Sequence, residues 1–128
     1  MKKSRIVSGE LAQRRKALLE KVFCPEGAIL VAENEFEKKI LNTQGAMVVK
    51  FWDGTPHPAQ EAFSSVARKY SEEIKFACIL VKDKQLRSKY NIRYSPTFVF
   101  FEDGEEKSRI SGPTLPDALD IWCEVNRD

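Results

Sequence analysis

The sequence predicts an α/β fold in which a central mixed β-sheet is flanked by helices. Apolar runs typical of buried strands alternate with segments whose apolar residues recur at helical spacing. This alternation predicts parallel pairing in the middle of the sheet, and Asp103-Gly104 between two strand-like runs predicts an antiparallel hairpin at one edge. The 128 residues suit one ordinary domain, which we expect to span residues 26–128 behind a charged helix within residues 1–25.

The predicted N-terminal helix runs from residue 4 to about residue 22 and is rich in charged side chains. Ser8 is a candidate N-cap, and Cys24-Pro25-Glu26-Gly27 ends the helix. Its broken apolar stripe consists of Ile6, Leu11, Leu18, Leu19, Val22 and Phe23. We expect an appendage that packs one edge on the domain, with a helix dedicated to a protein partner as the alternative.

The first half of the domain contains two predicted strands, each followed by a helix. The strands cover residues 28–31 and 46–52, and the helices cover residues 33–42 and a segment that ends near residue 71. The apolar side chains that predict these helices are Phe36, Ile40 and Leu41 in the first, and Ala62, Phe63, Val66, Ala67 and Tyr70 in the second.

The second half continues the same alternation and ends in the hairpin and a helix. Residues 74–81 and 97–101 are apolar runs that predict two further strands, and Asp83 is a candidate N-cap for a short helix between them. Residues 106–111 return as the partner strand of the hairpin. The last helix is predicted by Leu115, Leu119, Ile121, Trp122 and Val125, with Pro116 in its first turn.

The stretch over residues 46–70 is the place where the order of elements favours a functional site. A buried strand there leads into a helix through the loop of residues 53–58. Such a loop exposes unpaired backbone N–H groups beside the positive end of a helix dipole. In α/β proteins this is a favoured place for chemistry, so the side chains of the loop decide what the protein can do.

Several segments, taken in order, resemble the thioredoxin superfamily. Residues 48–52, Val-Val-Lys-Phe-Trp, are similar to the family's V-D-F-W strand, and residues 89–98 are similar to its K-Y-x-I-x-x-x-P-T-x segment. Residues 100–104 match its F-F-x-x-G hairpin, and Gly112 matches the glycine that closes the next strand. The resemblance covers residues 28–126 and implies a thioredoxin-like fold with a cis Ser95–Pro96 bond, which is a form that X-Pro bonds adopt at low cost.

The chain departs from the family at the redox motif itself. The family's W-C-G-P-C is replaced by Thr55-Pro56-His57-Pro58-Ala59, so that Pro56 and Ala59 occupy the two cysteine positions. Lys50 stands where the family has a buried acid that helps proton transfer. Thiol–disulfide exchange requires a thiolate that attacks a disulfide, and this loop contains no sulfur. We therefore expect no disulfide oxidoreductase activity from it.

The three cysteines are far apart in the sequence, and there is one histidine. A zinc site would need all three thiols to converge on His57, so we expect no metal and no cofactor. We expect Cys78 and Cys123 to be small buried hydrophobes and Cys24 to be the thiol that is exposed. Redox signalling through Cys24 is the alternative for that residue.

Two polar residues of the central stretch allow different interpretations. We expect His57 to be an exposed contact residue; the alternative is a general base that the helix dipole keeps neutral. We expect Lys50 to reach solvent or to pair with a carboxylate such as Glu61 or Asp53, whereas the alternative is a buried amine with a lowered pKa.

The candidate partner-binding surface consists of Trp52, Thr55, Pro56, His57, Pro58, Ser95 and Pro96. In thioredoxins the corresponding surface binds extended protein segments, so the resemblance implies a redox-inactive protein-binding or chaperone-like accessory factor. It is similar in this respect to phosducin-like proteins and to the thioredoxin-like accessory factors of hydrogenase maturation. The alternative is a thiol-dependent oxidoreductase or glutathione-linked enzyme that uses a cysteine outside the motif.

Composition excludes several other classes. The net charge is +2, which is too small to favour nucleic acid or an anionic membrane surface as the partner. No apolar run approaches the roughly 20 residues of a membrane span, and charged residues interrupt the segment behind the basic start. We therefore expect a cytoplasmic protein whose partner is another protein.

Overall fold

The computed structural model describes residues 11–14, 24–25, 27–55, 57, 59–112 and 116–128. Residues 11–14 are helical, and the rest of the helix predicted over residues 4–22 lies outside the described residues. The expected division of the chain near residue 25 therefore stays a prediction. Within the described residues, no helix is long and apolar enough to cross a membrane.

One five-stranded mixed sheet forms the centre of the structure, in the order β1-β3-β2-β4-β5. Its strands are β1 (Ala28–Val31), β2 (Ala46–Trp52), β3 (Lys75–Leu80), β4 (Thr97–Glu102) and β5 (Glu105–Ser111). β3 pairs in parallel with β1 and with β2, and β4 pairs antiparallel with β5, so both predicted pairings are confirmed. β2 is also antiparallel to β4, which the spacing of strands along the sequence does not indicate.

The helical segments are η1 (Glu33–Glu35), η2 (Glu37–Leu41), α2 (Gln60–Lys69), α3 (Lys84–Lys89) and α4 (Pro116–Arg127). The helix predicted over residues 33–42 is divided into a 3₁₀ turn, η1, and a π-helix, η2. The predicted N-cap of α3 is confirmed, because the Asp83 carboxylate accepts a hydrogen bond of 2.8 Å from the backbone N–H of Gln85.

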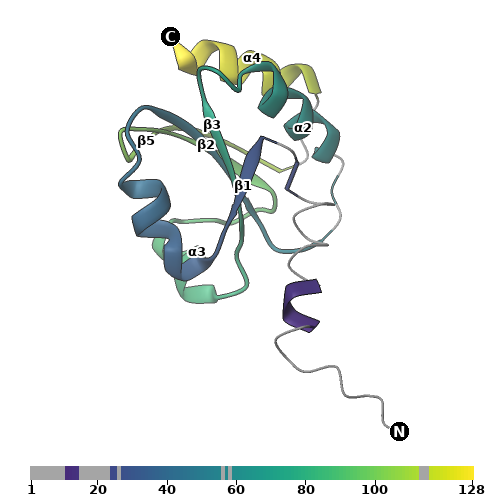
Figure 1. The fold of residues 1–128 in the computed structure, drawn as a ribbon, viewed down its shortest axis with the longest axis vertical. Coiled ribbons are helices and arrows are strands. Elements are labelled where there is room, and N and C mark those ends of the chain that lie inside the picture. The colour runs from purple at the N-terminus through teal and green to yellow at the C-terminus, as the bar shows by residue number, and fades with distance from the viewer. Residues whose placement is uncertain (1–10, 15–23, 26, 56, 58, 113–115) are drawn as a thin grey trace, which may run out of the picture.

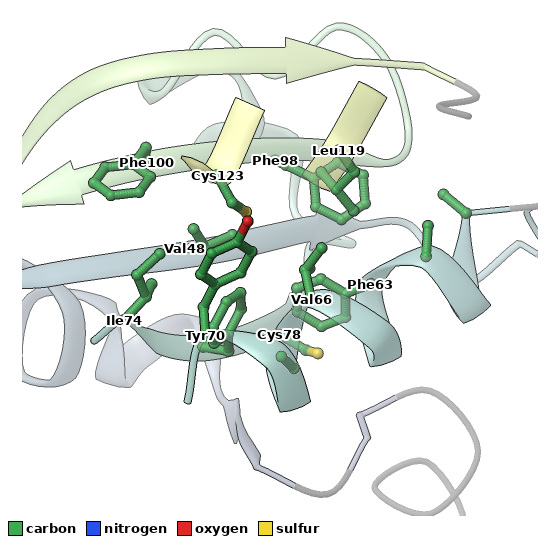
Figure 2. Close-up of a cluster of buried hydrophobic side chains, with 14 of the residues drawn as sticks. Val48, Phe63, Val66, Tyr70, Ile74, Cys78, Phe98, Phe100, Leu119 and Cys123 are labelled. Carbon is green, nitrogen blue, oxygen red and sulfur yellow. The ribbon is translucent and has the colours of Figure 1, made fainter. Parts of the chain in front are cut away.

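Helices cover both faces of the sheet, with α2 and α4 together on one side and α3 on the other (Figure 1). Alternate residues of β2 point to opposite faces, so Val48 joins the core under α2 and α4 while Val49 joins the core on the other side. Figure 2 shows the first of these cores, where side chains of both helices meet the strands; its labelled members include Val48, Phe63, Val66, Tyr70, Phe98, Leu119 and Cys123. Lys50 lies two residues after Val48, and the alternation therefore directs it to this same face.

Candidate functional site

Lys50 is a charged residue at the centre of the sheet. It lies on β2 between Cys78 of β3 and Phe98 of β4, and its side chain is 0% exposed. Its Nζ atom donates a hydrogen bond of 2.8 Å to Oε1 of Gln60, the first residue of α2, and lies 3.4 Å from Nε2 of His57. The aromatic rings of Trp52 and Phe63 complete its surroundings, with centroids 5.1 and 5.3 Å from Nζ.

The prediction that Lys50 reaches solvent or pairs with Glu61 or Asp53 is wrong. Both edges of β2 are paired and α2 covers this face, so the side chain is shielded from water, and its Nζ donates to the neutral amide of Gln60. Burial lowers the pKa of the Lys50 ammonium, and the neighbouring thiols of Cys78 and Cys24 partly oppose that effect. The alternative of a buried amine with a lowered pKa is the one that the structure supports.

His57 is half-buried rather than exposed, and its role as a contact residue stays a prediction. Burial, with the adjacent charge of Lys50, lowers the pKa of His57 to about 4 although Asp53 acts in the opposite direction. The imidazole is therefore neutral near pH 7, and its Nε2 can accept a hydrogen bond from Nζ of Lys50. The Nδ1 atom is buried without a hydrogen-bond partner among the described residues.

The general-base alternative for His57 needs a nucleophile within reach. Thr55 is the hydroxyl nearest to it in the loop, but its Oγ1 donates a hydrogen bond of 2.7 Å to the carboxylate of Asp53. The polar contact recorded for His57 is with Lys50. The described residues therefore do not present a histidine paired with a nucleophile.

Hydrogen bonds join the loop after β2 to the turn that precedes β4. The Ser95–Pro96 peptide bond is cis, as the family resemblance implies. The backbone N–H of Asp53 donates to Oγ of Ser95 over 3.0 Å, and this hydroxyl donates back to Oδ1 of Asp53 over 3.0 Å. The same Oδ1 accepts from the backbone N–H of Thr55 over 2.9 Å, and the bonds from Thr55 and Ser95 lower the pKa of Asp53. Asp53 thus links the loop after β2 to the cis-proline turn, and we call the space between these two segments the groove.

The predicted binding residues fall into different layers. Thr55 is exposed and Ser95 is half-buried, whereas Pro96 is buried. Trp52 was predicted to form part of the surface, but it is only 1% exposed, and its Nε1 donates a hydrogen bond of 2.8 Å to the backbone oxygen of Thr55. It faces the core because it shares the alternation of Val48 and Lys50, so it supports the loop from beneath.

Two of the predicted surface residues, Pro56 and Pro58, lie outside the described residues. Ala59, which occupies one of the family's cysteine positions, is buried directly before α2. Tyr94 was missed by the sequence analysis and is 64% exposed beside Ser95. Its place directly before the Ser-Pro pair was the available signal. We call the surface formed by Thr55, His57, Tyr94 and Ser95 the loop surface.

All three cysteines are buried thiols, so the prediction that Cys24 is exposed is wrong. Cys24 is 6% exposed because it packs into the core under α2 and α4, where it shares a hydrogen bond with Cys78. Burial raises the pKa of Cys78, and it raises the pKa of Cys123 to about 12. Among the described residues, no cluster of His, Cys, Asp and Glu side chains is suited to hold a metal ion.

The sheet order, the covering helices and the cis-proline turn define a protein of the thioredoxin fold. The crystal structure of a Malassezia sympodialis thioredoxin (Mala s 13), described as a member of a new pan-allergen family, superposes with a TM-score of 0.67. The match covers 79% of this chain and 91% of that one at 20% sequence identity. This similarity shows the fold.

The sequence model of the thioredoxin family matches residues 27–124, and the chain therefore belongs to the thioredoxin family. A thioredoxin of Rhodospirillum rubrum is 27% identical over 100 residues, which cover 75% of this chain and 96% of that relative. A thioredoxin of Pseudomonas aeruginosa is 25% identical over 105 residues, which cover 79% of this chain and 97% of the relative. The chain thus spans nearly the whole length of these relatives.

Proposed function

We propose that this protein is a redox-inactive member of the thioredoxin family that binds extended protein segments as an accessory or chaperone-like factor. The observation that carries the proposal is a sulfur-free loop held by Asp53 and Ser95 against a cis-proline turn. The part of the site that performs thiol chemistry in the family is missing, while the part that shapes the groove is present.

The lack of a suitable thiolate supports redox inactivity. Exchange begins with an accessible thiolate, but the cysteines of this chain are buried in the core and the pKa of both Cys78 and Cys123 is raised. Neither thiol lies in the loop after β2. The contact between Cys24 and Cys78 is the one observation that favours the alternative, a thiol-dependent or glutathione-linked enzyme.

The rigidity of the loop surface supports protein binding. The exposed Thr55 is held in place before any partner arrives, because its backbone N–H donates to the Asp53 carboxylate and its backbone oxygen accepts from the buried indole of Trp52. A fixed surface loses little conformational entropy on binding, and the exposed ring of Tyr94 supplies apolar contact area. The matching surface of thioredoxins binds extended protein segments, as the resemblance implies.

We also propose a cytoplasmic location, since all three cysteines are thiols and thiols persist in a reducing compartment. No partner other than protein is proposed, because the net charge of +2 gives no general attraction to nucleic acid or to anionic lipid.

Insulin reduction in the presence of dithiothreitol tests the redox part of the proposal. We expect the rate to equal that without the protein, under conditions in which a thioredoxin accelerates it strongly. Acceleration comparable to a thioredoxin, lost on Cys24→Ala or Cys78→Ala, would establish the enzyme alternative instead.

Site-specific photocrosslinking tests the binding part. A photoreactive amino acid replacing Thr55 should crosslink to a protein partner in cells, and Tyr94→Ala should weaken that crosslink. The control position is Lys75, which is exposed at the start of β3 and therefore at the opposite end of the sheet from the loop after β2. Crosslinks of equal strength from both positions would place the interface elsewhere.

A further inference from the structure

A hollow with basic walls lies next to the loop surface. Its volume is about 360 Å³, and it is lined by Lys84, Arg87, Ser88, Asn91, Ile92 and Arg93, from α3 and the segment behind it. We call it the basic hollow. No carboxylate lines it, and Lys84 and Arg93 are exposed while Arg87 is half-buried.

The segment around this hollow is rich in basic side chains. Residues 82–93 contain five basic side chains and one carboxylate, a local charge of +4, whereas the whole chain carries +2. The carboxylate, Asp83, is already engaged, because it accepts the capping hydrogen bond from Gln85. The other residues that the structure describes are acidic on balance, so within the described part of the chain this hollow is a favourable place for an anionic partner.

The basic side chains of the hollow differ from many others in the structure, because they are not neutralised by carboxylates of the described residues. Basic side chains that form ion pairs with carboxylates in the structure include Lys39, Lys69, Lys107, Arg109 and Arg127. Over the described part of the chain, Lys84, Arg87 and Arg93 make no ion pair, and the Nε atom of Arg93 instead donates to the Asn91 amide over 3.1 Å. These charges are available to a ligand.

The basic hollow is continuous with the groove beside the cis-proline. Arg87 and Arg93 also line a narrower depression whose other walls include Asp53, Tyr94 and Ser95. The Oδ1 atom of Asp53 is occupied by its bonds to Thr55 and Ser95. A chain that lies along the loop surface would therefore pass the Tyr94 ring and then meet the guanidinium groups.

We propose that the partner segment is acidic, with carboxylates that bind Arg87, Arg93 and Lys84 and an apolar side chain that packs on Tyr94. This inference rests on the proposed function and specifies the chemical class of the segment. Guanidinium groups can bind carboxylates through two parallel hydrogen bonds, and Arg and Tyr are residue types that contribute strongly at interfaces. A single hollow in a chain of net charge +2 suits a short peptide better than a polyanion such as nucleic acid.

Fluorescence anisotropy with a fluorescein-labelled synthetic peptide tests the inference. The peptide is short, rich in glutamate and contains one leucine; its controls replace every glutamate by glutamine or by lysine. The protein variant is Arg87→Gln/Arg93→Gln. The matched control, Arg68→Gln/Lys75→Gln, removes the same charge from exposed positions at the other end of the sheet. Competition with a single-stranded oligonucleotide completes the set.

We expect the glutamate peptide to bind about tenfold more weakly to Arg87→Gln/Arg93→Gln and unchanged to the matched control. Its binding should also weaken as salt rises, since the contacts are charged and partly exposed. Equal binding of the glutamine peptide, lost on Tyr94→Ala, would leave the proposed function in place and overturn the acidic segment. The acidic segment would also be overturned if no peptide binds. The same holds if the oligonucleotide binds more tightly than the peptide and loses this binding in the Arg87→Gln/Arg93→Gln variant.

Discussion

The Nζ atom of Lys50 lies 3.4 Å from the Nε2 atom of His57, beneath the first turn of α2. Burial lowers the pKa of both groups, and the charge of Lys50 lowers the pKa of His57 further, to about 4. Near neutral pH the imidazole is therefore neutral and can accept a hydrogen bond from the Lys50 amine. By resemblance, relatives with redox activity have an acid at the position of Lys50, so this pair changes the electrostatics under the whole loop.

Lys50→Met is expected to stabilise the protein by about 1–3 kcal/mol, measured by urea denaturation near pH 7. The side chain is 0% exposed and its Nζ donates to the neutral amide of Gln60, so burial deprives the ammonium form of hydration by bulk water. Methionine has a similar length and would fill the space between Trp52 and Phe63. The half-buried Gln60 can turn its amide to water.

Lys50→Ala is the control for that substitution. It also removes the charge, but it leaves a cavity under α2 and should destabilise by about 2–5 kcal/mol. Equal losses in both variants would mean that the hydrogen bond to Gln60 outweighs the cost of burying the amine.

His57 should make the protein less stable as the pH falls from about 6.5 to about 4. Its folded pKa lies below its unfolded value, so the unfolded chain binds the proton more tightly in this window and stability is lost with acid. In His57→Gln, the melting temperature should depend less on pH over this range. Loss of stability below about pH 4, where Asp53 and other carboxylates titrate, should remain in the variant. If the melting temperature of the variant falls with pH as steeply as that of the wild type above pH 4, protonation of His57 does not destabilise the fold.

The regular elements were predictable because each carries a local pattern. The apolar run of β2, the Asp83 cap and the Asp103-Gly104 turn are all decided by neighbouring residues. The burial of Lys50 and Trp52 was not predictable in this way. It depends on α2 lying over their face of the sheet, a contact between segments that the pattern within β2 does not contain.

The sequence analysis did not predict the hydrogen bonds by which Asp53 holds the groove, although one part of this pattern is local in the sequence. The Asp53-x-Thr55 spacing is typical of a carboxylate that accepts hydrogen bonds within its own turn. Its second partner, Ser95, is 42 residues away in the sequence, and only the pairing of β2 with β4 brings it close. The expectation of an exposed thiol at Cys24 failed for the same reason, because Cys24, Cys78 and α2 meet only in the folded chain.

Asp53 and Ser95 should be energetically coupled. Asp53→Ala and Ser95→Ala each remove hydrogen bonds that link the loop to the cis-proline turn, and each should cost about 1–2 kcal/mol. In a double-mutant cycle we expect a coupling energy of about 1 kcal/mol, with weaker peptide binding in all three variants. Additive losses of stability would mean that the two segments are held independently. The hydrogen bonds between Asp53 and Ser95 would then not be what holds the groove.

Restoring sulfur to the loop should restore redox activity. Pro56→Cys/Ala59→Cys places thiols at both family positions, where the N-terminus of α2 favours a thiolate. We expect insulin reduction to exceed that of the wild type and of either single substitution. Adding Lys50→Asp, which supplies the family's buried acid, should raise the rate by about tenfold more, because a positioned proton acceptor assists the exchange.

The outcome of this restoration also bears on binding, since insulin must enter the groove as an extended segment. Activity in the double variant would show that the groove between the loop and the Ser95–Pro96 turn accepts a protein chain, leaving the missing sulfur as the reason for inactivity. A disulfide that forms and is reduced by dithiothreitol, yet does not act on insulin, would instead show a groove closed to such segments. That result would count against protein binding at the loop surface, whatever the state of the thiols.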